Sequence, residues 1–142
     1  MAGYMTKMVG NIYEGEFTNG ADEAVENGVL LVPGTSGNAG KLVKPTADAD
    51  SKFLLKEVTT LYDGIEAYRF VPTKLATVYY FVENGFEVDE SVEYDTTKYT
   101  TPVGGMLRAH PIQVGEELVT TKITGSLTVG TEYGVKADGT IG

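Results

Sequence analysis

Residues 52–71, KFLLKEVTTLYDGIEAYRFV, decide the fold of this chain. Two runs rich in Val, Thr, Tyr, Phe and Leu flank the pair Asp63-Gly64, which is typical of a two-residue hairpin turn because Asp and Gly tolerate positive φ. The segment therefore predicts two antiparallel strands joined by this turn. Within both runs the alternation of apolar and polar residues slips, which predicts β-bulges or strands buried on both faces. Pro72 is expected to end the second strand, because proline cannot donate to a ladder.

The next strong pattern is TVYYFV at residues 77–82, a continuous apolar run that predicts a central strand buried on both faces. Asn84-Gly85 is expected to turn the chain into a further strand at residues 86–95, where apolar and acidic residues alternate. Because side chains alternate between the two faces of a strand, this segment should present an acidic wall to solvent.

The chain carries three more Asn-Gly or Asp-Gly pairs. Residues 21–26 contain good helix formers but are marginal in length for a helix, and a short strand paired through Asn27-Gly28 with a strand at 29–32 fits at least as well. Asn19-Gly20 is expected only to end a strand, and Asp138-Gly139 is expected to support little pairing. Short strands joined by close turns are typical of small sandwiches and barrels.

The fold predicted from these patterns is mainly β, either a small antiparallel β-sandwich or a β-barrel with hairpin connections. The chain has 142 residues, the size of one domain, and no internal repeat or long linker divides it. We expect residues 1–10, which are largely polar and irregular in pattern, to form a flexible N-terminal arm, and residues 11–142 to form a single β domain.

The formal net charge of −9 bears on the class of partner. Such a chain is repelled by nucleic-acid phosphates and by anionic membrane surfaces, so neither is an expected partner. It favours positively charged partners instead. No apolar run approaches the length of about 20 residues that a membrane span needs, and the N-terminus does not resemble a secretory signal. We expect the protein to be made in a cytoplasm.

The chain carries little of the usual equipment of catalysis. It has no Cys, and His110 is its only His and so the only candidate general base near neutral pH. Arg108 lies on the same face of the expected strand, but no motif selects a nucleophile or a third group. The many Asp and Glu residues offer numerous carboxylate pairs, but nothing in the sequence identifies one pair as catalytic. We therefore expect His110 to be structural, and the protein to be neither an enzyme nor a cofactor-binding protein.

Two loops resemble ligand sites in composition only. Asp48-Ala49-Asp50-Ser51 looks like the start of a calcium loop, but the spacing of an EF-hand is absent. The remaining possibility for calcium is a less regular site built from loop carboxylates. Residues 34–41, GTSGNAGK, resemble a glycine-rich phosphate loop but lack its Gly-Lys-Ser/Thr ending. We assign no metal or phosphate site from either.

The chain has nine tyrosines, and these residues suggest a second possible function. Tyr62, Tyr68, Tyr79 and Tyr80 are expected in the core with their hydroxyls near its rim. Tyr4, Tyr13, Tyr94 and Tyr99 are expected at edges or interfaces, where tyrosine is enriched. Solvent-facing aromatic side chains can also hold sugars, so a carbohydrate- or surface-binding β module of phage or bacterial origin is the second hypothesis.

Four stretches carry a resemblance to a known class of proteins. They are KMVGNIYEG at residues 7–15, VENGVLLV at 25–32, VGEELVTT at 114–121 and GSLTVG at 125–130. In these stretches, in its acidity and in its lack of Cys, the chain resembles the capsid decoration, or head cement, proteins of tailed bacteriophages.

The resemblance implies a virion structural protein that sits on the capsid exterior and bridges major capsid subunits, with the major capsid protein as its partner. It also implies a homo-oligomer, with a trimer favoured. An N-terminal arm of this kind can add a strand to a neighbouring sheet edge. On this basis the candidate capsid-contact residues are Tyr4, Met5, Met8, Ile12, Tyr13 and Phe17.

Overall fold

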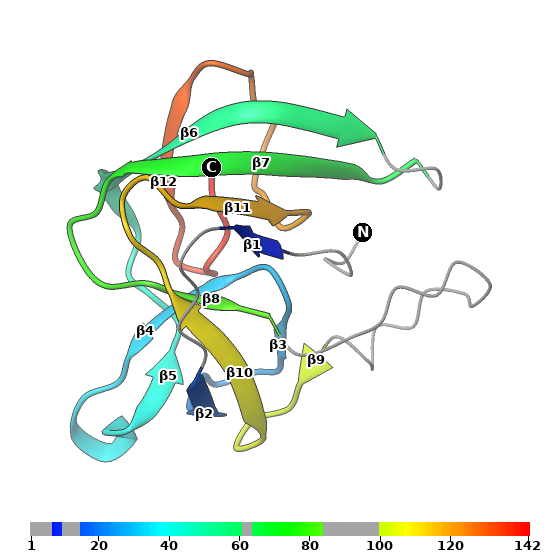
Figure 1. The fold of residues 1–142 in the computed structure, drawn as a ribbon. Coiled ribbons are helices and arrows are strands. Elements are labelled where there is room, and N and C mark those ends of the chain that lie inside the picture. Colours follow the sequence, from blue (N-terminus) through cyan, green and yellow to red (C-terminus); the bar gives the residue numbers. More distant parts are fainter. Residues whose placement is uncertain (1–6, 10–14, 61–63, 84–99) are drawn as a thin grey trace.

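The computed structural model describes residues 7–9, 15–60, 64–83 and 100–142, and these residues fold almost entirely into β-strands (Figure 1). One turn of 3-10 helix, η1 (Ser36–Asn38), interrupts them. Within the described ranges, no helix has the length and apolar character that crossing a membrane requires. The prediction of a mainly β fold is confirmed.

Five strands form an open antiparallel sheet in the order β1-β11-β7-β6-β12. They are β1 (Lys7–Val9), β6 (Asp48–Thr60), β7 (Glu66–Lys74), β11 (Glu117–Thr120) and β12 (Glu132–Val135). The predicted hairpin supplies the two longest strands, β6 and β7, which pair antiparallel from Lys52 to Thr60 of β6. The short strand β1 lies at one edge of this sheet, within the segment expected to be an arm.

Five further strands close into a barrel in the order β10-β2-β5-β4-β8. They are β2 (Gly15–Asn19), β4 (Leu30–Pro33), β5 (Lys41–Val43), β8 (Tyr80–Val82) and β10 (Met106–Pro111). Only β2 and β5 pair in parallel; the other barrel pairs are antiparallel. A separate two-stranded ladder joins β3 (Val25–Glu26) to β9 (Thr100–Thr101).

Two strands of the barrel are buried on both faces and so serve two cores. In β4, Leu30 enters one core cluster and Leu31 the other, and in β8 the same holds for Phe81 and Val82. The prediction of a doubly buried strand at residues 77–82 is thus confirmed for β8. It is wrong for the first part of the run, because Thr77 and Val78 are exposed and precede the strand.

The first core cluster fills the space between the open sheet and the barrel, and the second lies within the barrel and under β3. The buried members of the first are Leu30, Phe53, Leu55, Phe70, Tyr79, Phe81, Ile112, Leu118, Val135 and Ile141. Those of the second are Ala21, Val25, Val29, Leu31, Leu42, Val82, Leu107 and Ala109. A shared wall of β4 and β8 therefore joins the two halves of the fold.

The slips in the pattern of residues 52–71 correspond to real irregularities of the ladder. The register of β6 against β7 shifts between Lys52 and Phe53 and again between Leu55 and Glu57. The predicted bulges are confirmed. The prediction that Pro72 ends its strand is wrong, because β7 continues past it. Pro72 pairs with Phe53 beside the first shift, and its carbonyl oxygen accepts a hydrogen bond from the Gly115 N–H at 3.0 Å.

One turn prediction is also wrong. Asn27-Gly28 does form a turn with Gly28 at φ 93°, but it does not join a hairpin. The strand before it pairs with β9, and the strand after it pairs with β5 and β8. Asp138-Gly139 supports little pairing, as predicted: Lys136 N–H donates to the Thr140 carbonyl at 2.9 Å, and isolated bridges join Ile141 to Val135 and Ile123. Asn84-Gly85 and the acidic strand expected at 86–95 lie outside the described residues.

Candidate functional site

The described part of the structure does not bring the proposed capsid-contact residues together on one surface. Tyr4, Met5, Ile12 and Tyr13 lie outside it. Met8 is in β1, opposite Leu118 of β11. Phe17 is in β2, where its half-buried ring packs edge-on against Tyr80 with ring centroids 5.0 Å apart. The side chain of Phe17 therefore contributes to the barrel core.

His110 belongs to the interior of the protein. It lies in β10 opposite Phe81 and is 5% exposed. Its Nε2 atom is 3.5 Å from the Glu83 Oε2 atom, so a protonated ring would form an ion pair there. The burial of the ring favours the structural interpretation of His110.

The carboxylate of Asp48, considered above as a calcium ligand, is occupied by protein donors. Its Oδ2 atom accepts hydrogen bonds from the Ser51 hydroxyl at 2.6 Å and the Tyr79 hydroxyl at 2.7 Å. Its Oδ1 atom accepts from the Asp50 N–H at 2.8 Å and the Ser51 N–H at 3.2 Å. No group of three or more His, Cys, Asp or Glu side chains that could hold a metal ion occurs among the described residues.

These hydrogen bonds shift two pKa values. Those from Ser51 and Tyr79 lower the pKa of Asp48 to about 2, against its ordinary value of 3.8. Burial, together with the bond to Asp48, raises the pKa of the Tyr79 phenol to about 12 from 10.0. The arrangement thus holds Asp48 ionised and Tyr79 neutral over a wide range of pH.

We expect Asp48 to make part of the stability acid-sensitive. Its pKa is lower in the folded than in the unfolded chain, so its contribution is present above about pH 4 and is lost as the pH falls toward about 2. Asp48→Asn should lower the free energy of unfolding by about 1–2 kcal/mol at pH 7 and much less at pH 2. Urea denaturation followed by circular dichroism at pH values from 7 to 2 measures the loss of unfolding free energy at each pH. A deficit that stayed constant from pH 7 to pH 2 would contradict the assignment.

The glycine-rich segment at residues 34–41 is a compact connection between β4 and β5. Gly34 N–H donates to the Lys41 carbonyl at 2.8 Å, and η1 lies between them. An added Cβ at Gly34 would approach the Asn38 carbonyl oxygen to 2.5 Å, so the backbone is closely folded on itself here. Lys41 then begins β5 rather than a helix, which favours the surface-loop interpretation.

Three of the four tyrosines expected in the core pack there, and Tyr62 lies outside the described residues. Tyr79 is 1% exposed, Tyr68 stacks on Phe70, and Tyr80 meets Phe17. Tyr133 also packs against the first core cluster, and its hydroxyl accepts a hydrogen bond from the Thr128 N–H at 2.6 Å.

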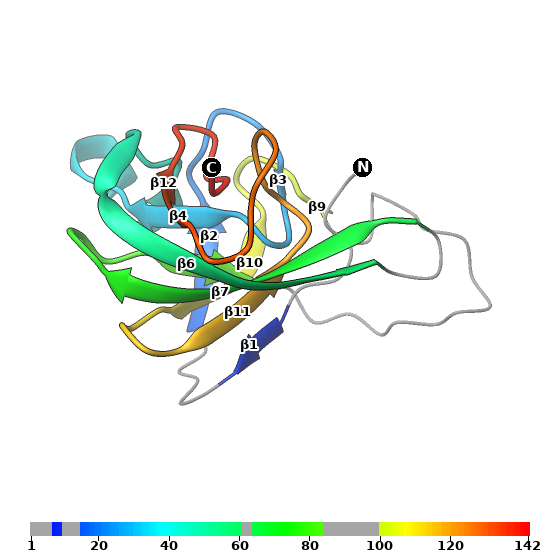
Figure 2. The ribbon, with the colours of Figure 1, turned by 90° about the horizontal axis from the view of Figure 1, so that it is seen from above.

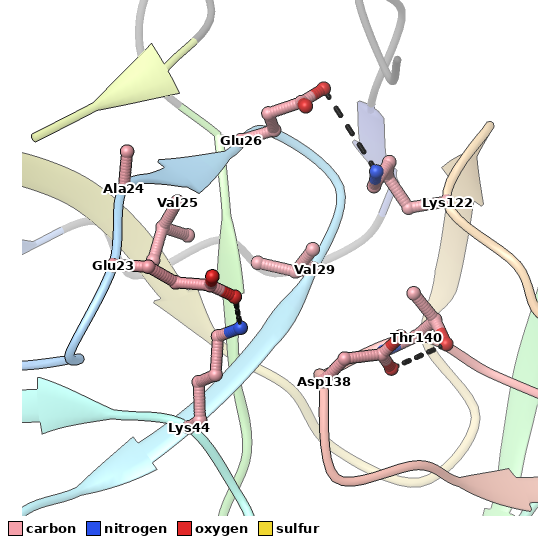
Figure 3. Close-up of a pocket in the computed structure, with 9 residues that line it drawn as sticks. All are labelled: Glu23, Ala24, Val25, Glu26, Val29, Lys44, Lys122, Asp138 and Thr140. Carbon is pink, nitrogen blue, oxygen red and sulfur yellow. Dashed lines mark hydrogen bonds and ion pairs between the residues drawn. The ribbon is translucent and has the colours of Figure 1, made fainter. Parts of the chain in front are cut away.

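A polar pocket of about 300 Å³ opens beside β3 (Figure 3). Its lining residues are Glu23, Ala24, Val25, Glu26, Val29, Lys44, Lys122, Asp138 and Thr140. Ion pairs link Lys44 to Glu23 and Lys122 to Glu26. Burial acts to raise the pKa of Asp138, but hydrogen bonds from Thr140 and the charge of Lys44 outweigh it and lower that pKa. The pocket therefore keeps charges of both signs, and none of the described residues that line it is aromatic.

The far end of the β6–β7 hairpin extends past the strands that flank it, although Ile65 and Ala67 at this end are buried. In Figure 2 this end reaches beyond the barrel. The ladder with β12 ends at Leu54, and the ladder with β11 ends at Tyr68. Thr59 and Thr60 therefore pair only with Ala67 and Glu66 among the described ladders. Two-stranded hairpins are marginally stable in water on their own, so such an extension is suited to contact with a partner.

Sequence reasoning did not single out the pocket or the hairpin end as surfaces. The pocket is assembled from four separate segments, and no local spacing links Glu23 to Lys44 or Asp138. The hairpin end had a signal, because the length of the run at residues 52–62 exceeds that of an ordinary strand. Comparisons with protein-family models, curated proteins and solved structures found no match to this chain.

Proposed function

We propose that this chain is a virion structural protein that decorates the outside of a tailed-phage capsid and stabilises it by bridging major capsid subunits. The observation that carries the proposal is the far end of the β6–β7 hairpin, which extends beyond the barrel and pairs with no third strand among the described residues. A strand extension of this kind is suited to binding a partner, and the sequence resemblance is the reason for proposing a capsid subunit as that partner.

The physical account requires no catalysis. Each contact with the capsid can be weak, because several subunits bound at once raise the effective concentration of every remaining contact. A homo-oligomer, for which we favour a trimer, multiplies the contacts again. The net charge of −9 would steer the protein toward basic patches on the capsid and away from packaged DNA.

Binding to purified, expanded heads that lack decoration tests the proposal. We expect saturable co-sedimentation with a fixed number of copies per head, and heads that withstand higher temperature once the protein is bound. Removing residues 1–10 should weaken binding while the domain stays folded, as judged by circular dichroism. Failure of the intact protein to sediment with heads of its own phage would rule the proposal out.

A carbohydrate- or surface-binding module is the alternative that the same protein preparation can test. No described structural feature favours it, because the described tyrosines of the core are packed and the polar pocket lacks an aromatic platform. Saturable binding on a glycan array, together with no binding to heads, would support this alternative instead.

A further inference from the structure

The buried side-chain amide of Asn19 joins the end of β2 to two neighbouring loops. Its Nδ2 atom faces three carbonyl oxygens, those of Thr101 at 3.0 Å, Glu23 at 3.3 Å and Pro102 at 3.3 Å. Its Oδ1 atom accepts a hydrogen bond from the Ala21 N–H at 2.9 Å. Asn19 is only 1% exposed, so both ends of the amide are used inside the protein.

The backbone of Asn19 holds the same region. Its N–H donates to the Gly105 carbonyl at 2.8 Å, and its carbonyl accepts from the Gly104 N–H at 2.9 Å. These glycines lie in the connection from β9 to β10, and β10 pairs with both β2 and β8 in the barrel. Asn19 therefore fixes the chain where it enters a strand on which closure of the barrel depends.

Asn19 is followed by Gly20, and an Asn-Gly pair readily loses ammonia in an unfolded chain, because glycine places no side chain in the way and lets the backbone reach the reactive geometry. The Gly20 backbone nitrogen loses its proton and attacks the Asn19 Cγ atom. The new C–N bond closes a succinimide ring, the bond from Cγ to Nδ2 breaks, and Nδ2 takes up a proton and leaves as ammonia. Water then opens the ring at either carbonyl, which leaves aspartate or isoaspartate.

The native fold withholds both reacting groups. The Gly20 N–H donates to the Leu42 carbonyl of β5 at 2.8 Å, so the attacking nitrogen keeps its proton and is held in the barrel ladder. The leaving nitrogen of Asn19 is held by the three carbonyl oxygens around it. Reaction in the native protein therefore requires the end of β2 to open first, and such openings are rare in a packed sheet.

We propose that Asn19 is a deamidation site of the unfolded chain, and that its conversion to aspartate or isoaspartate prevents the chain from refolding. A carboxylate has no hydrogen to donate, and it would place a buried negative charge against the carbonyl oxygens of Thr101, Glu23 and Pro102. Isoaspartate would also lengthen the backbone at the end of β2. The fold thus protects a residue that it needs, and the time a chain spends unfolded becomes limited by this reaction.

The wild-type protein supplies the first test. Native protein and protein unfolded in guanidinium chloride are kept at the same mildly alkaline pH, and peptide mapping by mass spectrometry follows the conversion of each asparagine. We expect Asn19 to react at least about tenfold more slowly in the native protein, because reaction there waits for local opening. In the unfolded sample Asn84-Gly85, the same dipeptide, provides the reference rate for Asn19.

Dilution of the unfolded sample then sorts the chains by their ability to refold. Size-exclusion chromatography separates the refolded protein from misfolded and aggregated chains, and both fractions are mapped. We expect intact Asn19 in the refolded fraction and its aspartate and isoaspartate products in the other. The longer the sample stays unfolded, the smaller the refolded fraction should become.

A pair of variants tests the consequence of the acid directly. Asn19→Asp introduces one of the two products, and Asn38→Asp makes the same change of amide to carboxylate at a half-buried position in η1. Asn19→Asp should lower the urea midpoint or fail to fold, whereas Asn38→Asp should denature close to the wild type.

Three results would overturn the inference. Equal rates at Asn19 in native and unfolded protein would show that the fold gives no protection. Aspartate or isoaspartate at Asn19 in the refolded fraction, in the same proportion as in the other, would show that the acid is tolerated. Equal urea midpoints for Asn19→Asp and Asn38→Asp would show that the buried donor is dispensable.

Discussion

Replacing Phe70 with alanine should lower the free energy of unfolding by about 3–5 kcal/mol, the largest effect we expect from one core substitution. Phe70 is fully buried at the centre of β7, where its neighbours across the two ladders are Leu55 and Leu118. Its ring also stacks on Tyr68, with centroids 6.5 Å apart. Truncation of the side chain would leave a cavity between the open sheet and the barrel wall, and neither can move far enough to fill it.

Urea denaturation followed by circular dichroism and tyrosine fluorescence would measure this loss, since the chain has no Trp. The control is Val129→Ala, at a loop position where the side chain is 53% exposed. It should change the free energy of unfolding by less than about 0.5 kcal/mol. A Phe70→Ala variant as stable as this control would mean that the first core cluster is not packed as described.

Gly139→Ala should cost about 3–4 kcal/mol, because it combines backbone strain with a steric clash. Gly139 has φ of 85°, in the left-handed region that favours glycine. A Cβ there would approach the Leu30 carbonyl oxygen to 2.5 Å, while the Leu30 N–H donates to the Gly139 carbonyl at 2.8 Å. The turn lies directly against β4, so the added methyl group would push against the backbone of the barrel wall.

Gly125→Ala separates the two costs, because Gly125 has φ of 81° but no atom within 4 Å of an added Cβ. It should cost only the backbone term of about 1–2 kcal/mol. The difference between the two alanine variants in thermal or urea denaturation therefore measures the clash. Equal losses would show that the turn can move away from β4 without penalty.

The local part of the fold could be predicted from the sequence. The hairpin of β6 and β7 depended on an Asp-Gly turn and two β-rich runs, and both signals lie within twenty residues of each other. The bulges were also visible, because a register shift moves the apolar residues of a strand from one face to the other. The double burial of β8 followed from a run without polar residues.

The remote pairings could not be predicted in this way. β3 pairs with β9 rather than with the strand that follows Asn27-Gly28, because distant segments compete for the same backbone groups. Pro72 continues its strand since the ladder beside it is already irregular. The turn at Asp138-Gly139 contacts β4, and no pattern near it in the sequence indicates this contact.

The outward face of the open sheet illustrates the same limit. Leu54 beside Phe53 and Leu55 looked only like a slip of phase, because the sequence does not say which strands flank β6 and β7. Once the register places Val71 and Val119 beside Leu54, the slip becomes an apolar centre on an outward face. The pocket near β3 had no signal at all, since its charged residues come from segments far apart in the chain.

The closure of the barrel has a consequence for the order of folding. β10 pairs with both β2 and β8, so its residues join the beginning of the described chain to its middle. Until residues 106–111 have been synthesised, β2 and β8 each lack this neighbour, and a growing chain exposes those edges. Contacts this remote in sequence slow the folding of β proteins. We therefore expect folding to be slow for a chain of this size, with chaperone dependence arising while the barrel is still open.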